Sequence, residues 1–201
     1  MIGFGGHEKL FEIALNIEDP LYIKEINFNK DTGELHLYID FKKGAKFACK
    51  VCGREVPVYD TTDKEWRHLN FFQYKAFLHF RTPRTNCPEH GVLLMEPPWA
   101  GISDFTLLMD ALILQLAKYM PVKEIADLLD EHDTKIWRII HHYVQEAYAE
   151  EDFSKVTKVG IDETAGKRGH NYVTLFVDMD ESKVIYATKG KDAATIKSLV
   201  V

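Results

Sequence analysis

Cysteine is scarce in this chain, with three in 201 residues, and an odd number cannot all pair in disulfides within one molecule. Long apolar runs are also missing. The most apolar stretch, residues 105–120, is interrupted by Asp110, Gln115 and Lys118, which argues against a membrane-spanning helix. Residues 1–16 have glycines and then an amphipathic pattern, without the apolar segment of a secretion signal. The missing signal, together with the metal-binding type of cysteine pattern described below, predicts a protein of the reducing cytosol.

An excess of positive charge is absent too, because 25 Lys and Arg face 31 Asp and Glu, for a net charge of −6. This balance argues against a uniformly basic nucleic-acid-binding protein. The charges are unevenly distributed: residues 40–90 carry ten basic and six acidic side chains, whereas residues 91–155 carry five and twelve. A polyanion should therefore approach residues 40–90 first. The excess of acidic side chains in residues 91–155 argues against DNA binding by that segment.

All three cysteines belong to one pattern, Cys49-x-x-Cys52 followed by Cys87-x-x-His90. Three thiols and an imidazole in two short pairs are the ligands that a closed, tetrahedral Zn²⁺ site requires. A glycine follows each pair and suits a chain that must turn back on itself. The alternative is two unrelated Cys/His pairs, but the spacing favours a structural zinc site.

The segment around the zinc pattern is expected to be rich in β-structure. Residues 7–19 predict a short helix, residues 26–41 a hairpin with its turn at 29–33, and residues 65–84 further strands. Strands with a metal-binding turn at each end are typical of a zinc ribbon. The basic side chains expected to contact phosphates are Arg67, Lys75, Arg81 and Arg84.

Three helices are predicted between residues 103 and 151. Ser103 is expected to cap the first, which runs to about Tyr119, and Pro121 fits the first turn of the second. The second helix is expected to bury five apolar residues, and the third has a helical apolar stripe. These two sets are Val122, Ile125, Ala126, Leu128 and Leu129, and then Ile136, Ile139, Ile140, Tyr143, Val144 and Ala147.

The short turn at residues 131–133 makes the second and third helices a candidate helix-turn-helix. The polar side of the third helix could reach base edges or phosphates in a major groove. Its residues are Thr134, Lys135, Arg138, His141, His142 and Gln145. An ordinary helical hairpin with a solvated polar face explains the same spacing, and both interpretations stay open.

The last segment predicts strands at 156–161, 171–178 and 183–188, followed by a helix from Asp192 to the last residue, 201. Asp162 and Glu163 end the first of these strands. Ribonuclease-H-like nucleases hold their first metal-binding carboxylate at the tip of a buried first strand in such a β-β-β-α run. In such a site two Mg²⁺ ions activate the attacking hydroxyl. An Asp at a strand end can equally be a cap or part of a surface turn.

Several short stretches resemble the bacterial insertion-sequence transposases of the group called IS-L-three. They are GIDETA at 160–165, KRGHNYVT at 167–174, WRHL at 66–69, CPEHG at 87–91, PWA at 98–100 and GKDAAT at 190–195. The resemblance spans residues from about 40 to the last. It implies an N-terminal zinc ribbon, a helix-turn-helix, and then a DDE catalytic domain of the ribonuclease-H type.

The resemblance implies DNA strand cleavage and transfer at the terminal inverted repeats of a mobile element. It makes Cys49, Cys52, Cys87 and His90 the zinc ligands and Asp162 the first catalytic acid, with Mg²⁺ expected for the complete catalytic domain. The second Asp and the Glu of such enzymes lie well downstream, and 39 residues follow Asp162. A lone carboxylate cannot assemble a two-metal site. We therefore expect a chain that is inactive in strand transfer on its own.

The predicted fold class is α+β with several domains: residues 1–96 with the zinc ribbon, 97–152 with the helix-turn-helix, and 153–201 as an incomplete ribonuclease-H-like segment. The expected partners are double-stranded DNA and a second copy of the chain, in a nucleoid-associated protein without membrane contact. The second copy would use the apolar face formed by Leu107, Leu108, Ala111, Leu112 and residues 114–116, although the same stripe can instead belong to the internal core. Two alternatives remain, a truncated transposase acting as a DNA-binding regulator and a zinc-stabilised protein-interaction module.

Overall fold

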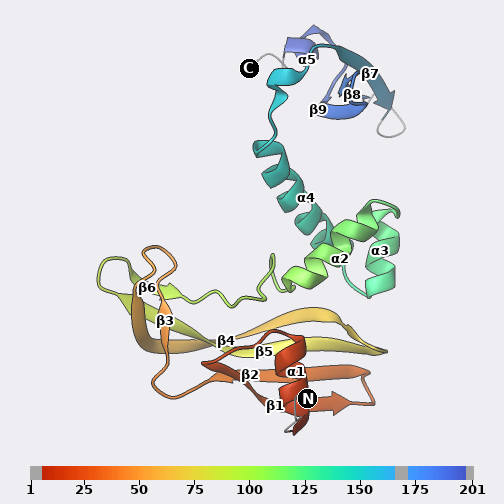
Figure 1. The fold of residues 1–201 in the computed structure, drawn as a ribbon. Helices are drawn as coiled ribbons and strands as arrows, with labels where there is room; N and C mark the ends of the chain where they lie inside the picture. The colour runs from red at the N-terminus through yellow and green to blue at the C-terminus, as the bar shows by residue number, and fades with distance from the viewer. Residues whose placement is uncertain (1–5, 166–171, 198–201) are drawn as a thin grey trace. The chain divides into compact units, whose positions relative to one another are not determined.

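Two separate β-sheets organise the chain, as the computed structural model shows (Figure 1). The structure describes residues 6–165 and 172–197. The chain divides into two units, Met1–Val144 and Gln145–Val201. The first unit has a six-stranded sheet and the second a three-stranded sheet, so the predicted mixture of strands and helices is confirmed. Within the described residues, no helix has both the length and the hydrophobicity needed to cross a membrane.

The six-stranded sheet has the order β1-β2-β5-β4-β3, with β6 paired to β5. Its strands are β1 (Leu21–Asn29), β2 (Glu34–Phe41), β3 (Lys46–Ala48), β4 (Glu55–Phe71), β5 (Tyr74–Cys87) and β6 (Gly91–Leu94). The predicted hairpin is β1 with β2, and the turn between them contains Gly33 at φ 70°. The strands β2 and β5 pair in parallel, a long-range contact that local sequence patterns do not reveal.

Alternation along β2 and β5 gives this sheet one apolar face and one polar face. Leu35, Leu37 and Ile39 of β2 are buried, whereas the residues between them are half-buried. On the apolar side the core continues with Ala76, Leu78, Phe80, Trp66, Trp99 and, from α1 (Gly6–Ala14), Phe11. The helix α1 ends before the predicted residue 19 because Asn16 adopts a positive φ of 52°.

Three helices follow, as predicted: α2 (Leu107–Ala117), α3 (Val122–Leu129) and α4 (Asp133–Ala149). Two predicted boundaries were wrong. Ser103 does not cap α2, because it lies in the preceding turn with φ 64°, and Thr106 caps the helix by accepting from the Met109 amide at 3.4 Å. The helix α2 ends at Ala117 rather than near Tyr119.

The helices form a second core, and its members are Phe105, Met109, Ile113, Ile125, Ala126, Ile136 and Ile139. The predicted apolar faces of α3 and α4 include side chains that the packing between the helices does not bury. Leu128 is 61% exposed, against the prediction that it is buried, and two members of the predicted stripe of α4 are also exposed, Val144 at 55% and Ala147. Because α3 has only eight residues, a narrow stripe is enough for its packing.

The second unit contains β7 (Val159–Ala165), β8 (Tyr172–Asp178) and β9 (Lys183–Lys189) in an antiparallel sheet, followed by α5 (Ala193–Lys197). The first strand starts at Val159 rather than at the predicted residue 156, after a 3₁₀ turn at Phe153–Lys155 and three residues without regular structure. Asp162 therefore lies in the middle of β7 instead of at its tip. The strand is not buried either, since Ile161 is 51% exposed. The predictions for 166–171, which include most of the KRGHNYVT motif, and for 198–201 fall outside the described residues.

Candidate functional site: a cysteine and histidine cluster and a helix-turn-helix

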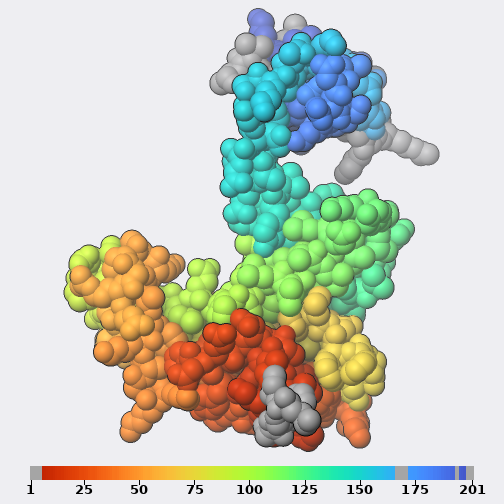
Figure 2. Space-filling model, viewed as in Figure 1, coloured from red at the N-terminus to blue at the C-terminus, as the bar shows by residue number. Residues whose placement is uncertain are grey.

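Two tight turns bring the predicted zinc ligands together. Cys49 follows β3, and its backbone accepts from the Gly53 amide at 2.8 Å while its amide donates to the Arg54 carbonyl at 2.8 Å. Cys87 ends β5 and pairs with Gly91 at the start of β6, so His90 lies in the intervening turn. Gly53 and Gly91 have φ of 72° and 70°, values that an L side chain rarely adopts. Figure 2 shows atoms of this region, coloured orange and yellow-green, gathered in a lobe.

The four ligand atoms have the separations that a zinc ion imposes. The sulfurs of Cys52 and Cys87 are 3.7 Å apart, and His90 Nδ1 lies 3.7 Å from Cys49 Sγ and 3.5 Å from Cys87 Sγ. A tetrahedral Zn²⁺ with ordinary bond lengths holds two sulfurs about 3.8 Å apart and a sulfur and a nitrogen about 3.6 Å apart. The donor set therefore fits a closed structural zinc site, and the cluster is the only one of its kind among the described residues.

Backbone amides at the two turns favour the thiolate forms of Cys49 and Cys87. Amides of Cys52 and Val51 donate to Cys49 Sγ and lower the pKa of that thiol. At the other turn, the Glu89 amide lowers the pKa of the Cys87 thiol. An ion pair joins the turns, with Arg54 Nη2 donating to Glu89 Oε1 at 2.6 Å.

Three of the four basic residues expected to bind phosphate already pair with acids of the same unit. Arg81 donates to Asp40 at 2.8 Å, and Arg84 donates to Asp60 at 2.6 Å. Lys75 pairs with Asp130, which caps α3. These side chains are at the surface, yet a neighbouring carboxylate compensates most of each positive charge. Their electrostatic attraction for a polyanion is therefore weaker than the sequence suggested.

Arg67 is in a different position, because it is buried with 3% of its surface exposed. Its guanidinium donates to the His68 carbonyl and to Asn70 Oδ1, and its Nε lies 3.8 Å from Glu131. A side chain engaged in this way cannot reach a phosphate. We therefore leave Arg67 out of the surface that could contact DNA.

The turn between α3 and α4 has the geometry of a helix-turn-helix connection. Asp130 caps α3 in the left-handed conformation, and α4 begins at Asp133 after two further residues. On α4, Thr134, Arg138, His141 and Gln145 are exposed and His142 is half-buried. Lys135 donates to Asp104 at 2.7 Å and to Glu131 at 3.2 Å, so its charge is compensated. Arg138 donates to the Ser103 hydroxyl at 3.0 Å and retains its positive charge for a ligand.

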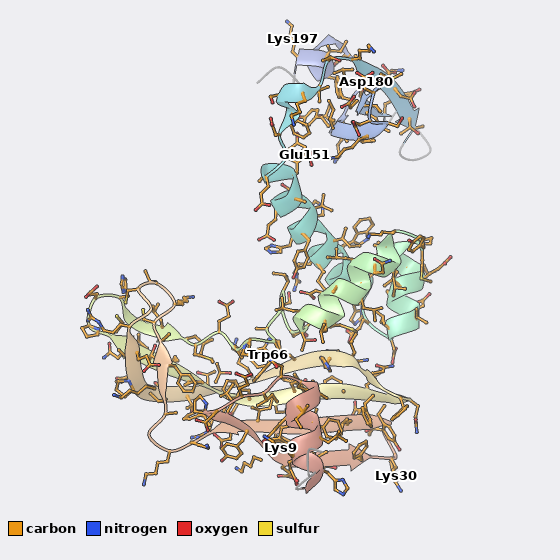
Figure 3. All side chains as sticks on the ribbon, in the orientation of Figure 1. Lys9, Lys30, Trp66, Glu151, Asp180 and Lys197 are labelled. Carbon is orange, nitrogen blue, oxygen red and sulfur yellow. The ribbon has the colours of Figure 1, made fainter. Side chains whose placement is uncertain are left out.

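A cleft beside the start of α4 adds residues that the sequence analysis missed. It has a volume of about 650 Å³, and its lining includes Lys64 of β4, His132, Thr134 and Arg138. Trp66, labelled in Figure 3, marks the stretch of β4 on this cleft. The predicted strands began at residue 65, so the sequence analysis left Lys64 out, and the packing of β4 near α4 brings it close to the helix-turn-helix.

Asp162 has no partner carboxylates for a metal site among the described residues, where the cysteine cluster alone groups three or more metal-ligating side chains. Its Oδ1 accepts from the Glu163 amide at 2.9 Å. Two acids of the β8–β9 hairpin have structural contacts: Asp178 accepts from the Asp180 amide at 2.9 Å, and Asp180 pairs with Lys158 at 3.0 Å. Asp162 by itself therefore does not hold the metal ions that phosphodiester chemistry requires.

Comparison with known protein families gives three matches in consecutive order along the chain. Residues 45–90 match the zinc-finger of transposase IS204/IS1001/IS1096/IS1165. Residues 103–144 match the helix-turn-helix domain of transposase family ISL3, and residues 159–201 match a family described as transposase, the ISL3 DDE type. The first two matches coincide with the metal cluster and with the three helices.

Curated relatives agree with these matches. The chain is 28% identical over 200 residues to the transposase for insertion sequence element IS1557 of Mycobacterium tuberculosis, in strains CDC 1551 / Oshkosh and H37Rv. It is 26% identical over 183 residues to the transposase for insertion sequence element IS1001 of Bordetella parapertussis. These alignments cover 94% and 88% of the chain but 44% of each relative, so the chain spans less than half their length. No solved structure matches the chain.

Proposed function

Because the chain belongs to the ISL3 family of insertion-sequence transposases, we propose that it recognises the terminal inverted repeats of such an element as double-stranded DNA. The observation that carries this proposal is the order of the three family matches, with the helix-turn-helix directly after the zinc-binding segment. We assign residues 1–96 to the zinc-ribbon part, 97–152 to the helix-turn-helix part, and 153–201 to the start of a ribonuclease-H-like catalytic part.

In this proposal α4 is the recognition helix, and its first turns enter the major groove. Arg138 is exposed and free of acidic partners among the described contacts, and therefore suits a base edge or a nearby phosphate. Lys64 borders the same cleft and suits the DNA backbone. Thr134, His141, His142 and Gln145 line the rest of the face. Such binding would associate the protein with the nucleoid.

We further propose that the described residues bind DNA but do not cleave it. Asp162 corresponds to the first catalytic acid in the family's motif, and Mg²⁺ would be bound there only with additional carboxylates. Asp178 and Asp180 are engaged in the β8–β9 hairpin turn. Strand cleavage and transfer at the element ends would require those further acids.

A protein-interaction role is the second candidate function. One observation favours it, namely that Lys75, Arg81 and Arg84 are neutralised by acids of the same unit, in a chain of net charge −6. The exposed apolar pair Leu107 and Leu108, 47% and 55% exposed, also supports a second copy of the chain as a partner. Sedimentation of the wild type and of Leu108→Glu would test that association.

The DNA proposal is tested by fluorescence anisotropy with a labelled duplex of the element's terminal repeat and with a scrambled duplex. We expect Lys64→Ala to weaken binding to both duplexes and to reduce the salt dependence by about one counterion. Arg138→Ala should cost about 1–3 kcal/mol of discrimination if it contacts a base. Lys30→Ala is the matched control, because Lys30 is an exposed residue of the β1–β2 turn.

Failure to bind either duplex at low salt would contradict the proposal and favour the protein-interaction role. Equal affinity for the repeat and for the scrambled duplex would retain DNA binding but contradict recognition of the element ends. A salt dependence reduced equally by Lys30→Ala would contradict the placement of DNA at the cleft.

A further inference from the structure

The cleft beside the start of α4 is continuous with a second, smaller hollow. The second hollow has a volume of about 170 Å³, and Lys64, Trp66 and Ser103 line both. Arg138 of α4 lines the cleft, whereas Lys50, in the turn of the cysteine cluster after β3, lines the second hollow. Together the cleft and the second hollow form a groove that extends from the helix-turn-helix, across β4, to the cysteine cluster.

Positive charge exceeds negative charge along this groove. Four cations and three carboxylates line it, in a chain whose net charge is −6. One cation and one carboxylate of the lining, Lys135 and Asp104, pair with each other at 2.7 Å. The other three cations, Lys50, Lys64 and Arg138, are exposed and have no carboxylate partner among the described residues. Because unpaired cations attract a polyanion more strongly than paired ones, the groove favours an anionic ligand.

Two carboxylates of the groove limit this attraction. Glu65 borders the cleft and lies 3.3 Å from His79 Nδ1, whereas Glu96 borders the second hollow. Glu96 is exposed, and no cation pairs with it among the described residues. A polyanion that follows the groove should therefore be repelled by Glu96, and removal of that charge should strengthen binding.

The continuous pairing of β4 with β5 holds the two ends of the groove in place. These strands pair from Val58, near the cysteine cluster, to Phe71, beyond the cleft. Trp66, labelled in Figure 3, is buried, and its ring packs edge-on against that of Trp99 with centroids 6.2 Å apart. A groove with so rigid a floor does not have to be ordered by its ligand, which lowers the cost of binding.

We propose that one strand of a DNA duplex follows this groove and that Arg138, Lys64 and Lys50 contact its phosphates in that order. The order is that of the lining, because Lys64 belongs to both hollows and lies between the other two. The inference rests on the proposed function, in which α4 enters the major groove beside the cleft. It adds the turn of the cysteine cluster to the DNA-binding surface. Such phosphate contacts fix the register of a recognition helix without reading sequence.

The test measures binding of the zinc-loaded full chain to the terminal-repeat duplex and to the scrambled duplex over a range of salt concentrations. We expect Lys50→Ala to weaken binding to both duplexes by about 3- to 10-fold near physiological salt and to reduce the salt dependence by about one counterion. Lys50→Arg keeps the charge and should restore binding. Glu96→Gln should tighten binding to both duplexes, because it removes a carboxylate beside the phosphates.

Lys46→Ala is the matched control, because Lys46 is an exposed lysine of β3 that lines neither the cleft nor the second hollow. It should change the affinity by less than about twofold, since its charge acts on the duplex only through screening solvent. Ethylation interference then locates the contacts. Lys50→Ala should lose sensitivity at phosphates on one end of the protected row, and Arg138→Ala at the other end.

The outcomes separate this inference from the proposed function. A wild type that binds neither duplex contradicts both. If the wild type binds and Lys50→Ala binds as tightly as Lys46→Ala, the path through the second hollow is overturned while the role of α4 is retained. Loss of sensitivity at the same phosphates in Lys50→Ala and Arg138→Ala would also overturn the path. Zinc content and circular dichroism establish that each variant is folded.

Discussion

At the scale of single residues, His68 shows how burial sets the behaviour of a side chain. It lies on β4, and its Nδ1 is 2.9 Å from the hydroxyl of Thr106, the residue that caps α2. Burial, followed by the positive charge of Arg67, lowers the pKa of His68 to about 4. The imidazole is therefore neutral in the folded protein at pH 7.

This pKa predicts a loss of stability in acid. Between pH 6.5 and 4 the unfolded chain binds a proton on His68 that the folded protein does not bind, so the free energy of unfolding falls as the pH falls. The full difference amounts to about 3 kcal/mol. Urea unfolding of the wild type and of His68→Gln, which cannot titrate, should show a steeper pH dependence for the wild type across this window.

Zinc release in acid affects both proteins equally, so the difference between the two pH profiles isolates His68. Parallel profiles for the wild type and His68→Gln would show that His68 is protonated as easily in the folded protein as in the unfolded chain.

At the scale of elements, Arg67 connects β4 to the helices. Its amide donates to the Asp104 carbonyl at 2.7 Å, and its carbonyl accepts from the Thr106 amide at 3.1 Å, so the segment before α2 runs beside β4. Its guanidinium approaches Glu131 in the α3–α4 turn, and Glu131 in turn accepts from Lys135 of α4. One buried cation therefore holds the start of α2 and the turn of the helix-turn-helix against the sheet.

Replacing this residue should be costly. We expect Arg67→Met to lower the free energy of unfolding by about 3–5 kcal/mol, because Glu131, with a side chain only 13% exposed, loses a cationic neighbour and Asn70 loses a donor. Urea denaturation followed by tryptophan fluorescence measures the change. Arg138→Met is the matched control and should change stability by no more than about 0.5 kcal/mol, because Arg138 is exposed. Equal effects of the two substitutions would contradict the role of Arg67.

At the scale of the whole molecule, the two units have different sources of stability. The first has two apolar cores and the zinc cluster. The second has one three-stranded sheet, and several of its apolar side chains are exposed, including Val159, Ile161, Met179 and Val184. A small sheet with little buried apolar surface is marginally stable.

Heating should therefore produce two transitions, with the second unit unfolding at the lower temperature. Trp66, Trp99 and Trp137 all belong to the first unit, so tryptophan fluorescence follows that unit alone, while far-ultraviolet circular dichroism follows both. A chelator or Cys87→Ser should lower the fluorescence transition only, because zinc binding energy is folding energy there. Coincident transitions by both probes, or a fluorescence transition insensitive to chelator, would contradict this description.

Local chemistry is what the sequence by itself determined. The convergence of Cys49, Cys52, Cys87 and His90 in one cluster was predicted from spacing alone, because a short turn fixes the separation of two side chains three residues apart. The β1–β2 hairpin and the three helices were predicted because their turns and apolar periods are encoded over a few residues. The family resemblance likewise depends on short motifs in a fixed order.

Long-range packing is what only the tertiary structure decided. The burial of Arg67, the role of Thr106 as the cap of α2, and the position of Lys64 on the cleft depend on β4 lying against residues of a distant segment. The contact between His36 and His79 requires the parallel pairing of β2 with β5, which joins residues 43 positions apart. Sequence periodicity shows which face a side chain occupies, but register and neighbouring strands are set by contacts between segments far apart in the chain.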